Sequence, residues 1–238
     1  MGGRIVRPEQ GATLELPEIG RLHIGKKQMG QSGKEYPVSV DYFIPSGKYA
    51  GMFTKALGDK PATIQVVFPS DSPEQVCNER FEYRDDKGAL VARGDGQTFE
   101  IWNGQKYAAY SVAQYPDIMA QIAAKNPTKR ADNWDIVLTL RVVIPAVRGV
   151  VGVWQFSTKG RASSIKNIRE SFDAVQRIRG TVTQTVFDLS VQFAKSNKPG
   201  VTSRYPVVSL VANDSRIEEI RQSLAPEQNL GLLLPNRT

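Results

Sequence analysis

Residues 80–110 read RFEYRDDKGALVARGDGQTFEIWNGQKYAAY, and the turn residues within them decide the fold. Three groups interrupt the stretch: Asp85-Asp86-Lys87-Gly88, Gly94-Asp95-Gly96 and Asn103-Gly104. Asn-Gly tolerates the positive φ angles that the central positions of a tight hairpin turn require. The stretch therefore predicts a meander of antiparallel strands at residues 80–84, 89–93, 98–102 and 105–110.

The residues before the meander predict strands around one helix. Residues 1–20 are rich in Pro, Gly and Glu and predict an irregular N-terminal arm. We expect a short strand at 21–24, a basic glycine-containing loop at 25–34, and a β-α-β unit made of a strand at 38–44, a helix at 49–57 and a strand at 63–68. Pro45, Gly58 and Pro69 end these three elements. The loop lacks the GxxxxGK(S/T) spacing of a phosphate-binding loop, and a hairpin loop explains it equally well.

The residues after the meander predict a second mixed region. A short helix is expected at 116–125, and residues 125–133 are the best candidate for a boundary. The elements then follow in the order strand (134–144), strand (151–157), helix (164–179), strand (181–193), strand (204–212) and terminal helix (215–224). The chain is thus divided into segments 1–20, 21–125, 134–225 and 226–238, the last an extended tail.

The expected fold class is α+β, with mostly antiparallel sheets, a central β-meander and a few covering helices. The ββαββα order of residues 134–225 fits an RRM-like or ferredoxin-like half, but order alone does not establish it.

Composition excludes several classes of protein. Apolar residues make up 40% and charged residues 23%, which is ordinary for a globular chain. The longest apolar runs are too short to cross a bilayer, and the N-terminus lacks a secretion signal, so we expect a cytoplasmic protein without a membrane partner. Cys77 and His23 are the only residues of their types. An internal disulfide and a thiolate or histidine zinc cluster are therefore ruled out, and the sequence offers no convincing Ser-His-Asp set.

Positive charge is concentrated in the second half of the chain. The net charge is +7, and residues 126–238 hold 16 Lys and Arg against 9 Asp and Glu, whereas residues 1–125 hold 15 of each. Such asymmetry is typical of a protein with a polyanionic partner, although a solubilising surface explains it equally well.

The helix expected at 164–179 carries the main functional suggestion. Its core face is formed by Ile165, Ile168, Phe172, Val175 and Ile178. Ser163 or Ser164 is expected to cap its first turn, and Gly180 to end it. A helix N-terminus with basic neighbours suits a phosphate group.

The candidate nucleic-acid contacts are the basic residues on and before this helix: Arg148, Lys159, Arg161, Lys166, Arg169 and Arg177. Contacts of this kind hold a protein on a phosphate backbone without reading sequence. The alternative is a solvated charged face. Trp154, Phe156 and Tyr205 could stack on bases, but alternation within strands favours packing in the core.

Catalysis is the weaker interpretation. A carboxylate metal site for phosphoryl cleavage could use Asp41, Asp71, Asp95 or Asp135. Asp71 and Asp95 lie in turn sequences, however, where aspartate is expected on conformational grounds. We expect no enzyme activity, no cofactor and no bound metal.

A series of motifs resembles a known family. In order they are GRLHIG (20–25), YP (36–37), DYF (41–43), KP (60–61), VFPSD (67–71), RGDG (93–96), GVWQFSTK (152–159), SSI (163–165) and FDL (187–189). Together they resemble the Gp3-like phage proteins, a family that includes recombination directionality factors of large serine integrases. The resemblance implies a mobile-element protein that binds its integrase on DNA and redirects recombination from integration to excision.

Other relatives are described as hydrolases or metal-binding proteins, and many carry clustered cysteines before the segment that matches 134–144. Residues 103–133 of this chain contain no cysteine, which argues against a metal role.

Four hypotheses follow. The first is a nucleic-acid-associated accessory protein of a phage or mobile element, with DNA favoured over RNA and with a serine integrase or another protein as partner. The second is an RRM-like RNA-binding subunit of a CRISPR-type ribonucleoprotein. The third is a carboxylate-metal nuclease, and the fourth is a protein-interaction module that uses the leucine-rich tail.

Overall fold

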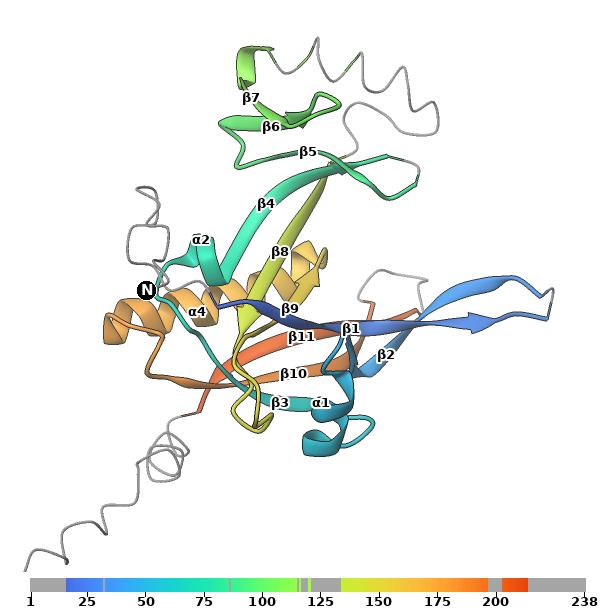
Figure 1. Ribbon diagram of the computed structural model, residues 1–238, viewed down its shortest axis with the longest axis vertical. Helices are drawn as coiled ribbons and strands as arrows, with labels where there is room; N and C mark the ends of the chain where they lie inside the picture. The colour runs from blue at the N-terminus through green and yellow to red at the C-terminus, as the bar shows by residue number, and fades with distance from the viewer. Residues whose placement is uncertain are drawn as a thin grey trace, which may run out of the picture.

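The computed structural model describes residues 16–31, 33–85, 87–114, 116, 120, 134–196 and 203–213. Within them the chain forms an eight-stranded mixed sheet and a three-stranded antiparallel sheet, with few helices (Figure 1). The predicted α+β class, dominated by sheet, is confirmed.

The strands are β1 (Glu18–Met29), β2 (Glu35–Ser46), β3 (Thr63–Val67), β4 (Cys77–Arg84), β5 (Leu90–Gly94), β6 (Thr98–Trp102), β7 (Tyr107–Ser111), β8 (Asp135–Val142), β9 (Val153–Thr158), β10 (Val186–Lys195) and β11 (Arg204–Ala212). The helices are α1 (Ala50–Leu57), α2 (Pro73–Val76) and α4 (Lys166–Arg179). A 3₁₀ turn (Val112–Gln114) follows β7, and a π-helical turn (Arg161–Ile165) precedes α4.

The predicted meander is confirmed as β4-β5-β6-β7, which ends the eight-stranded sheet in antiparallel order. The last reversal differs from the prediction, because it uses four residues, 103–106, between the paired Trp102 and Tyr107. The Asn103 side chain accepts hydrogen bonds from the Gln105 and Lys106 N–H groups, and only Gly104 has a positive φ, of 100°. Asparagine thus closes this turn through its side chain rather than through its own backbone conformation.

A buried carboxylate stabilises the first strand of the meander. Glu82 on β4 is 2% exposed, and its two oxygens accept hydrogen bonds from Arg80 and Arg84, at 2.8 and 2.7 Å for the closest pairs. Both arginines keep part of their guanidinium groups in solvent. The buried charge is therefore compensated on both sides by charged donors, as such a residue requires.

The main hydrophobic core lies between the two sheets and α4. Phe68, next to β3, packs edge-to-face against Phe172 of α4 and Phe187 of β10, with ring centroids 5.0 and 5.1 Å apart. A pair of backbone hydrogen bonds between Val67 and Val143 links the three-stranded sheet to the residues that follow β8. The sheets are therefore joined by both packing and hydrogen bonds.

The pairing of the strands differs from the order predicted along the chain. The expected β-α-β unit is wrong, because β2 belongs to the eight-stranded sheet and β3 to the three-stranded sheet. The RRM-like arrangement is likewise not formed by the described strands, since β8 and β9 pair in one sheet and β10 and β11 in the other. Strand order in sequence does not fix partners, which are chosen by burial and by contacts between distant segments.

Several predicted elements lie outside the described residues. These are most of the helix at 116–125, the boundary at 125–133, the terminal helix, the tail and most of the N-terminal arm. The division into segments stays a prediction. Strands from both sides of the boundary share each sheet: β8 pairs with β4, and β10 pairs with β3.

The first two strands are longer than predicted. The first half of the loop expected at 25–34 is strand, because β1 continues to Met29, and β2 begins directly after the predicted loop at Glu35. Pro45 does not end its strand but pairs with Leu22. β2 lies at the edge of the sheet, where the missing N–H of proline removes no ladder hydrogen bond.

Candidate nucleic-acid interface

Helix α4 has the predicted core face over most of its length. Ile168, Phe172 and Val175 are buried, as is Ile165 just before the helix. Ile178 is 81% exposed, so its assignment to the core is wrong. The core face ends one turn before the helix does.

The start of α4 is built differently from the prediction. Neither serine caps the helix, which has no side-chain capping hydrogen bond at its N-terminus. Ser164 is buried, and its hydroxyl accepts a hydrogen bond from the Val208 N–H of β11 at 2.9 Å. The serine therefore ties the edge strand of the small sheet to the π-helical turn. Gly180 ends the helix as predicted, with a φ of 74°.

Three of the six candidate basic residues already have acidic partners. Lys159 pairs with Asp135 at 2.6 Å, and Lys166 lies 3.8 Å from Glu170 one turn further along α4. Arg169 is the most engaged of the three, and its side chain is 32% exposed.

Arg169 connects α4 to β4. Its guanidinium donates a hydrogen bond to the carbonyl oxygen of Cys77 at 3.3 Å. It also lies 3.7 Å from a carboxylate oxygen of Glu79 and 3.6 Å from one of Asp173. Its charge is thus compensated within the fold, so its first role is structural.

The other three residues, Arg148, Arg161 and Arg177, are exposed and have no ion pair among the described residues. Arg161 and Arg177 lie before α4 and in its fourth turn. The β8–β9 pair has two ends. Arg161 lies near the end where Leu138 pairs with Thr158, whereas Arg148 lies beyond the other end, where Val142 pairs with Trp154. The six strand residues of β9 span about 20 Å, so the structure does not bring all six candidates together.

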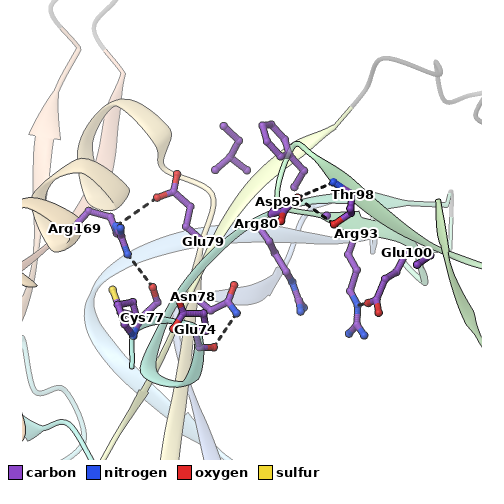
Figure 2. Close-up of a pocket in the computed structure, with 15 residues that line it drawn as sticks. Glu74, Cys77, Asn78, Glu79, Arg80, Arg93, Asp95, Thr98, Glu100 and Arg169 are labelled. Carbon is purple, nitrogen blue, oxygen red and sulfur yellow. Dashed lines mark hydrogen bonds and ion pairs between the residues drawn. The ribbon is translucent and has the colours of Figure 1, made fainter. Parts of the chain in front are cut away.

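A groove of about 940 Å³ lies between α2, α4 and the meander (Figure 2). Its charged lining residues are Glu74, Glu79, Arg80, Arg93, Asp95, Glu100 and Arg169. Each arginine has a carboxylate partner: Arg169 has Glu79, Arg80 has Glu82, and Arg93 has Glu100 at 2.5 Å. The lining thus has four carboxylates against three arginines that are already paired, and the groove offers no preformed site for a phosphate.

Core packing, which the sequence favoured for all three strand aromatics, is confirmed for two of them and wrong for Tyr205. Trp154 and Phe156 are buried in the core, where Trp154 packs against Phe53 with ring centroids 5.3 Å apart. Tyr205 is 40% exposed on β11 and is the one of the three that a base could reach.

The aspartates considered for a metal site are not gathered together. Within the described residues, no group of three or more His, Cys, Asp or Glu side chains could hold a metal ion. Asp135 pairs with Lys159, and Asp95 accepts hydrogen bonds from the Thr98 and Gln97 N–H groups, which lower its pKa. Each has a structural partner instead.

Asp71 joins two distant loops. Its carboxylate accepts hydrogen bonds from the Val182 N–H (2.7 Å), the Thr181 hydroxyl (2.8 Å) and the Thr183 N–H (3.1 Å). Burial alone raises the pKa of Asp71, but these hydrogen bonds outweigh it and leave the pKa below its ordinary value. A carboxylate held this way orders the turn between α4 and β10.

Cys77, the single thiol, is fully buried, and burial raises its pKa to about 12. A thiol held protonated in this way is a poor nucleophile, as the sequence predicted.

Sequence reasoning missed one basic feature, the projecting part of the β1–β2 hairpin. Lys26, Lys27 and Lys34 are all exposed there. The signal was visible as the basic stretch 25–34, but it was interpreted as a loop. Lys26 and Lys27 lie on β1 and Lys34 lies at the turn before β2, so a strand pair holds these lysines out from the body of the molecule (Figure 1).

A family model described as Gp3-like, recombination directionality factor-like, matches residues 19–213. The chain belongs to the Gp3-like family. The match covers the described strands, from the second residue of β1 to the end of β11, but no residue of the leucine-rich tail, and it confirms the resemblance carried by the sequence motifs. No curated protein and no solved structure matches the chain.

Membership of the Gp3-like family indicates an accessory role in phage recombination. The family is one of accessory factors rather than of catalysts. None of the described helices has both the length and the apolar character that a membrane span requires.

Proposed function

We propose that this protein is an accessory factor of a phage or mobile element that redirects site-specific recombination from integration to excision, through contacts with DNA and a serine integrase. The observation that carries the proposal is the family match over residues 19–213.

The exposed basic residues around α4 are the proposed contacts with the phosphate backbone. Arg161 and Arg177 lead this set because each is exposed and neither is engaged in an ion pair within the described part of the chain. Lys166 has only a 3.8 Å pair on an exposed helix face, which costs little to break. Arg148 is a separate contact beyond the far end of β9. Arg169 contributes mainly to the fold, and Lys159 would first have to leave its 2.6 Å pair with Asp135.

The proposed function is tested directly by a recombination assay. The protein is added to a purified serine integrase from the same phage or mobile element, with either the integrative or the excisive pair of attachment sites. Excision should increase and integration should decrease as the protein is titrated. An unchanged ratio of the two products with the cognate integrase would refute the proposal.

The DNA contacts are tested separately, by mobility shift of labelled duplex DNA, single-stranded DNA and RNA at two salt concentrations. Replacing Arg161 and Arg177 with glutamine should weaken duplex binding and reduce the slope of log affinity against log salt by about 0.9 for each phosphate that is no longer neutralised. Lys87/Lys106→Gln, which removes two exposed charges from turns of the meander, is the matched control. Equal effects of both variants would show that the residues near α4 act only through net charge.

A further inference from the structure

The projecting part of the β1–β2 hairpin is a two-stranded ribbon, Gly25–Met29 paired with residues 35–39. β1 also pairs with β9, but only as far as Leu22, which lies opposite Phe156. Beyond that point β1 has β2 as its strand partner, and Figure 1 shows the ribbon extending past both sheets. Its residues are exposed on both faces, apart from the half-buried Val38 and the half-buried Gly30 at the turn.

The base of this ribbon is fixed in the core. Between the paired residues His23–Ile44 and Gly25–Ser39, four residues of β2 lie opposite the single residue Ile24. This wide bulge directs Val40 and Phe43 inward, and both are buried. The Phe43 N–H also donates to the carbonyl oxygen of Pro61 at 2.9 Å. Bulges bend and redirect a strand pair, so the ribbon leaves the sheet from an anchored point.

The tip is closed by backbone hydrogen bonds. The Gly30 N–H donates to the Lys34 carbonyl at 2.9 Å, and the Gly33 N–H to the Gly30 carbonyl at 3.0 Å. Gly33 has a φ of 72°, which favours glycine. Hydrogen bonds among Gly30, Gly33 and Lys34 therefore link the two strands at the tip.

The two faces of the ribbon differ in charge. On one face Lys27 pairs with Glu35 at 3.0 Å, which neutralises both. The other face presents Lys26, Gln28, Tyr36 and Val38, because alternate residues share a face and Gln28 lies opposite Tyr36. Lys26, and Lys34 at the turn, have no acidic partner among the described residues. Residues 25–39 hold three lysines against one glutamate and carry a net positive charge.

We propose that this ribbon inserts into the major groove of duplex DNA, with Lys26 and Lys34 on the phosphates and the tip glutamines, Gln28 and Gln31, toward the base edges. The major groove of B-DNA is about 12 Å wide and 8.5 Å deep and admits a two-stranded β-ribbon. Five residues of β1 beyond the sheet reach about 16 Å. The ribbon is thus long enough to reach the groove floor while the body of the protein stays outside.

This inference deepens the proposed function by adding a second DNA contact, distinct from the residues near α4. Charge complementarity favours DNA over a protein surface, because residues 25–39 carry a net positive charge and Lys26 and Lys34 have no acidic partner among the described residues. The large exposed apolar residues Met29 and Tyr36, which are 64% and 45% exposed, lie on opposite faces of the ribbon and so do not form one apolar site.

The first test compares Lys26/Lys34→Gln with Lys87/Lys106→Gln in binding to labelled duplex DNA over a range of salt concentrations. Removing two charges that neutralise phosphates should reduce the slope of log affinity against log salt by about 1.8. The control should stay within experimental error of the wild type. An arm variant with the wild-type slope overturns the proposal while leaving the contacts near α4 intact.

The second test locates the tip directly. Gln31→Cys introduces a reactive thiol, whereas the native Cys77 is fully buried and remains unmodified in the folded protein. An iron chelate attached at position 31 should cut bound duplex DNA within a few base pairs, with the strand offset of a major-groove source. The proposal is overturned if the protein binds DNA without cutting it, or if the cuts have the strand offset of a minor-groove source. It is also overturned if, with integrase added, the chelate cuts integrase but not the DNA. If the wild-type protein binds no duplex DNA at all, direct DNA contact by both surfaces fails together.

Discussion

Replacing Arg169 with alanine should destabilise the protein without weakening its binding to DNA. The magnitude follows from three contacts. The hydrogen bond to the Cys77 carbonyl, at 3.3 Å, has a charged donor but is long, so it contributes about 1.5 kcal/mol, the low end for its class. The pairs with Glu79 and Asp173 involve partly exposed side chains and contribute at most about 1 kcal/mol together. The expected loss of unfolding free energy is therefore about 2 kcal/mol.

Urea denaturation followed by tryptophan fluorescence measures this loss as a lower midpoint with an unchanged slope. For a chain of this size, the melting temperature should fall by about 4–8 °C. Arg177→Ala is the matched control on the same helix, because Arg177 is exposed and is not engaged in an ion pair within the described part of the chain. Its effect on stability should stay within about 0.5 kcal/mol.

The two variants should behave in the opposite way towards DNA. Arg177→Ala should reduce the salt slope of duplex binding by about 0.9, whereas Arg169→Ala should leave it unchanged, because Glu79 and Asp173 already compensate its charge. A stable Arg169→Ala protein with a reduced slope would refute the reasoning, since Arg169 would then be a phosphate contact and its ion pairs incidental.

Three further predictions concern the polar groups that stabilise the fold. Glu82→Gln should cost about 2–4 kcal/mol by urea denaturation, because one amide oxygen cannot accept from both flanking arginines, whereas Glu100→Gln at an exposed pair should cost less than about 1 kcal/mol. The lowered pKa of Asp71 means that its carboxylate contributes stability above the ordinary aspartate pKa of 3.8, and that this contribution is lost as the pH falls below it. Asp71→Asn should therefore be less stable at neutral pH and lose less on acidification, and parallel acid titrations of the two proteins would contradict this. Cys77 should resist a thiol reagent at about pH 8 in the folded protein and react at once in urea; rapid labelling without urea would mean that the site opens locally.

Local chemistry predicted the elements whose causes are local. Turn residues between 85 and 104 located the meander, and glycine at position 180 located the end of α4. Hydrophobic periodicity identified Ile168, Phe172 and Val175 as core residues. In each case the information lies within a few residues of the feature it determines.

Features that depend on distant partners escaped sequence reasoning. Nothing near Ser164 indicates that its hydroxyl serves the Val208 N–H rather than the helix start, because β11 lies 44 residues further along the chain. The assignment of β2 and β3 to different sheets was hidden for the same reason. Arg169 looked like one member of a basic stripe until its contacts with β4 were visible.

The balance of charge in each half of the chain does not show where exposed basic residues gather. Residues 1–125 carry equal numbers of basic and acidic residues, so the net positive charge of the chain comes from residues 126–238. The structure shows where part of that acidic charge is used: Glu82 and Glu100 pair with arginines of the meander, and Glu79 pairs with Arg169 from the other half.

Those carboxylates pair with arginines in the body of the molecule. They therefore do not neutralise the positive charge of the lysines on the projecting ribbon. Screening at physiological ionic strength limits interactions between exposed charges to about 8 Å, so distant acids have little influence on Lys26 and Lys34. A phosphate backbone meets the local charge of the surface it touches, not the net charge of a segment. The half of the chain with no net charge can therefore present a basic arm, and DNA binding should depend on both halves.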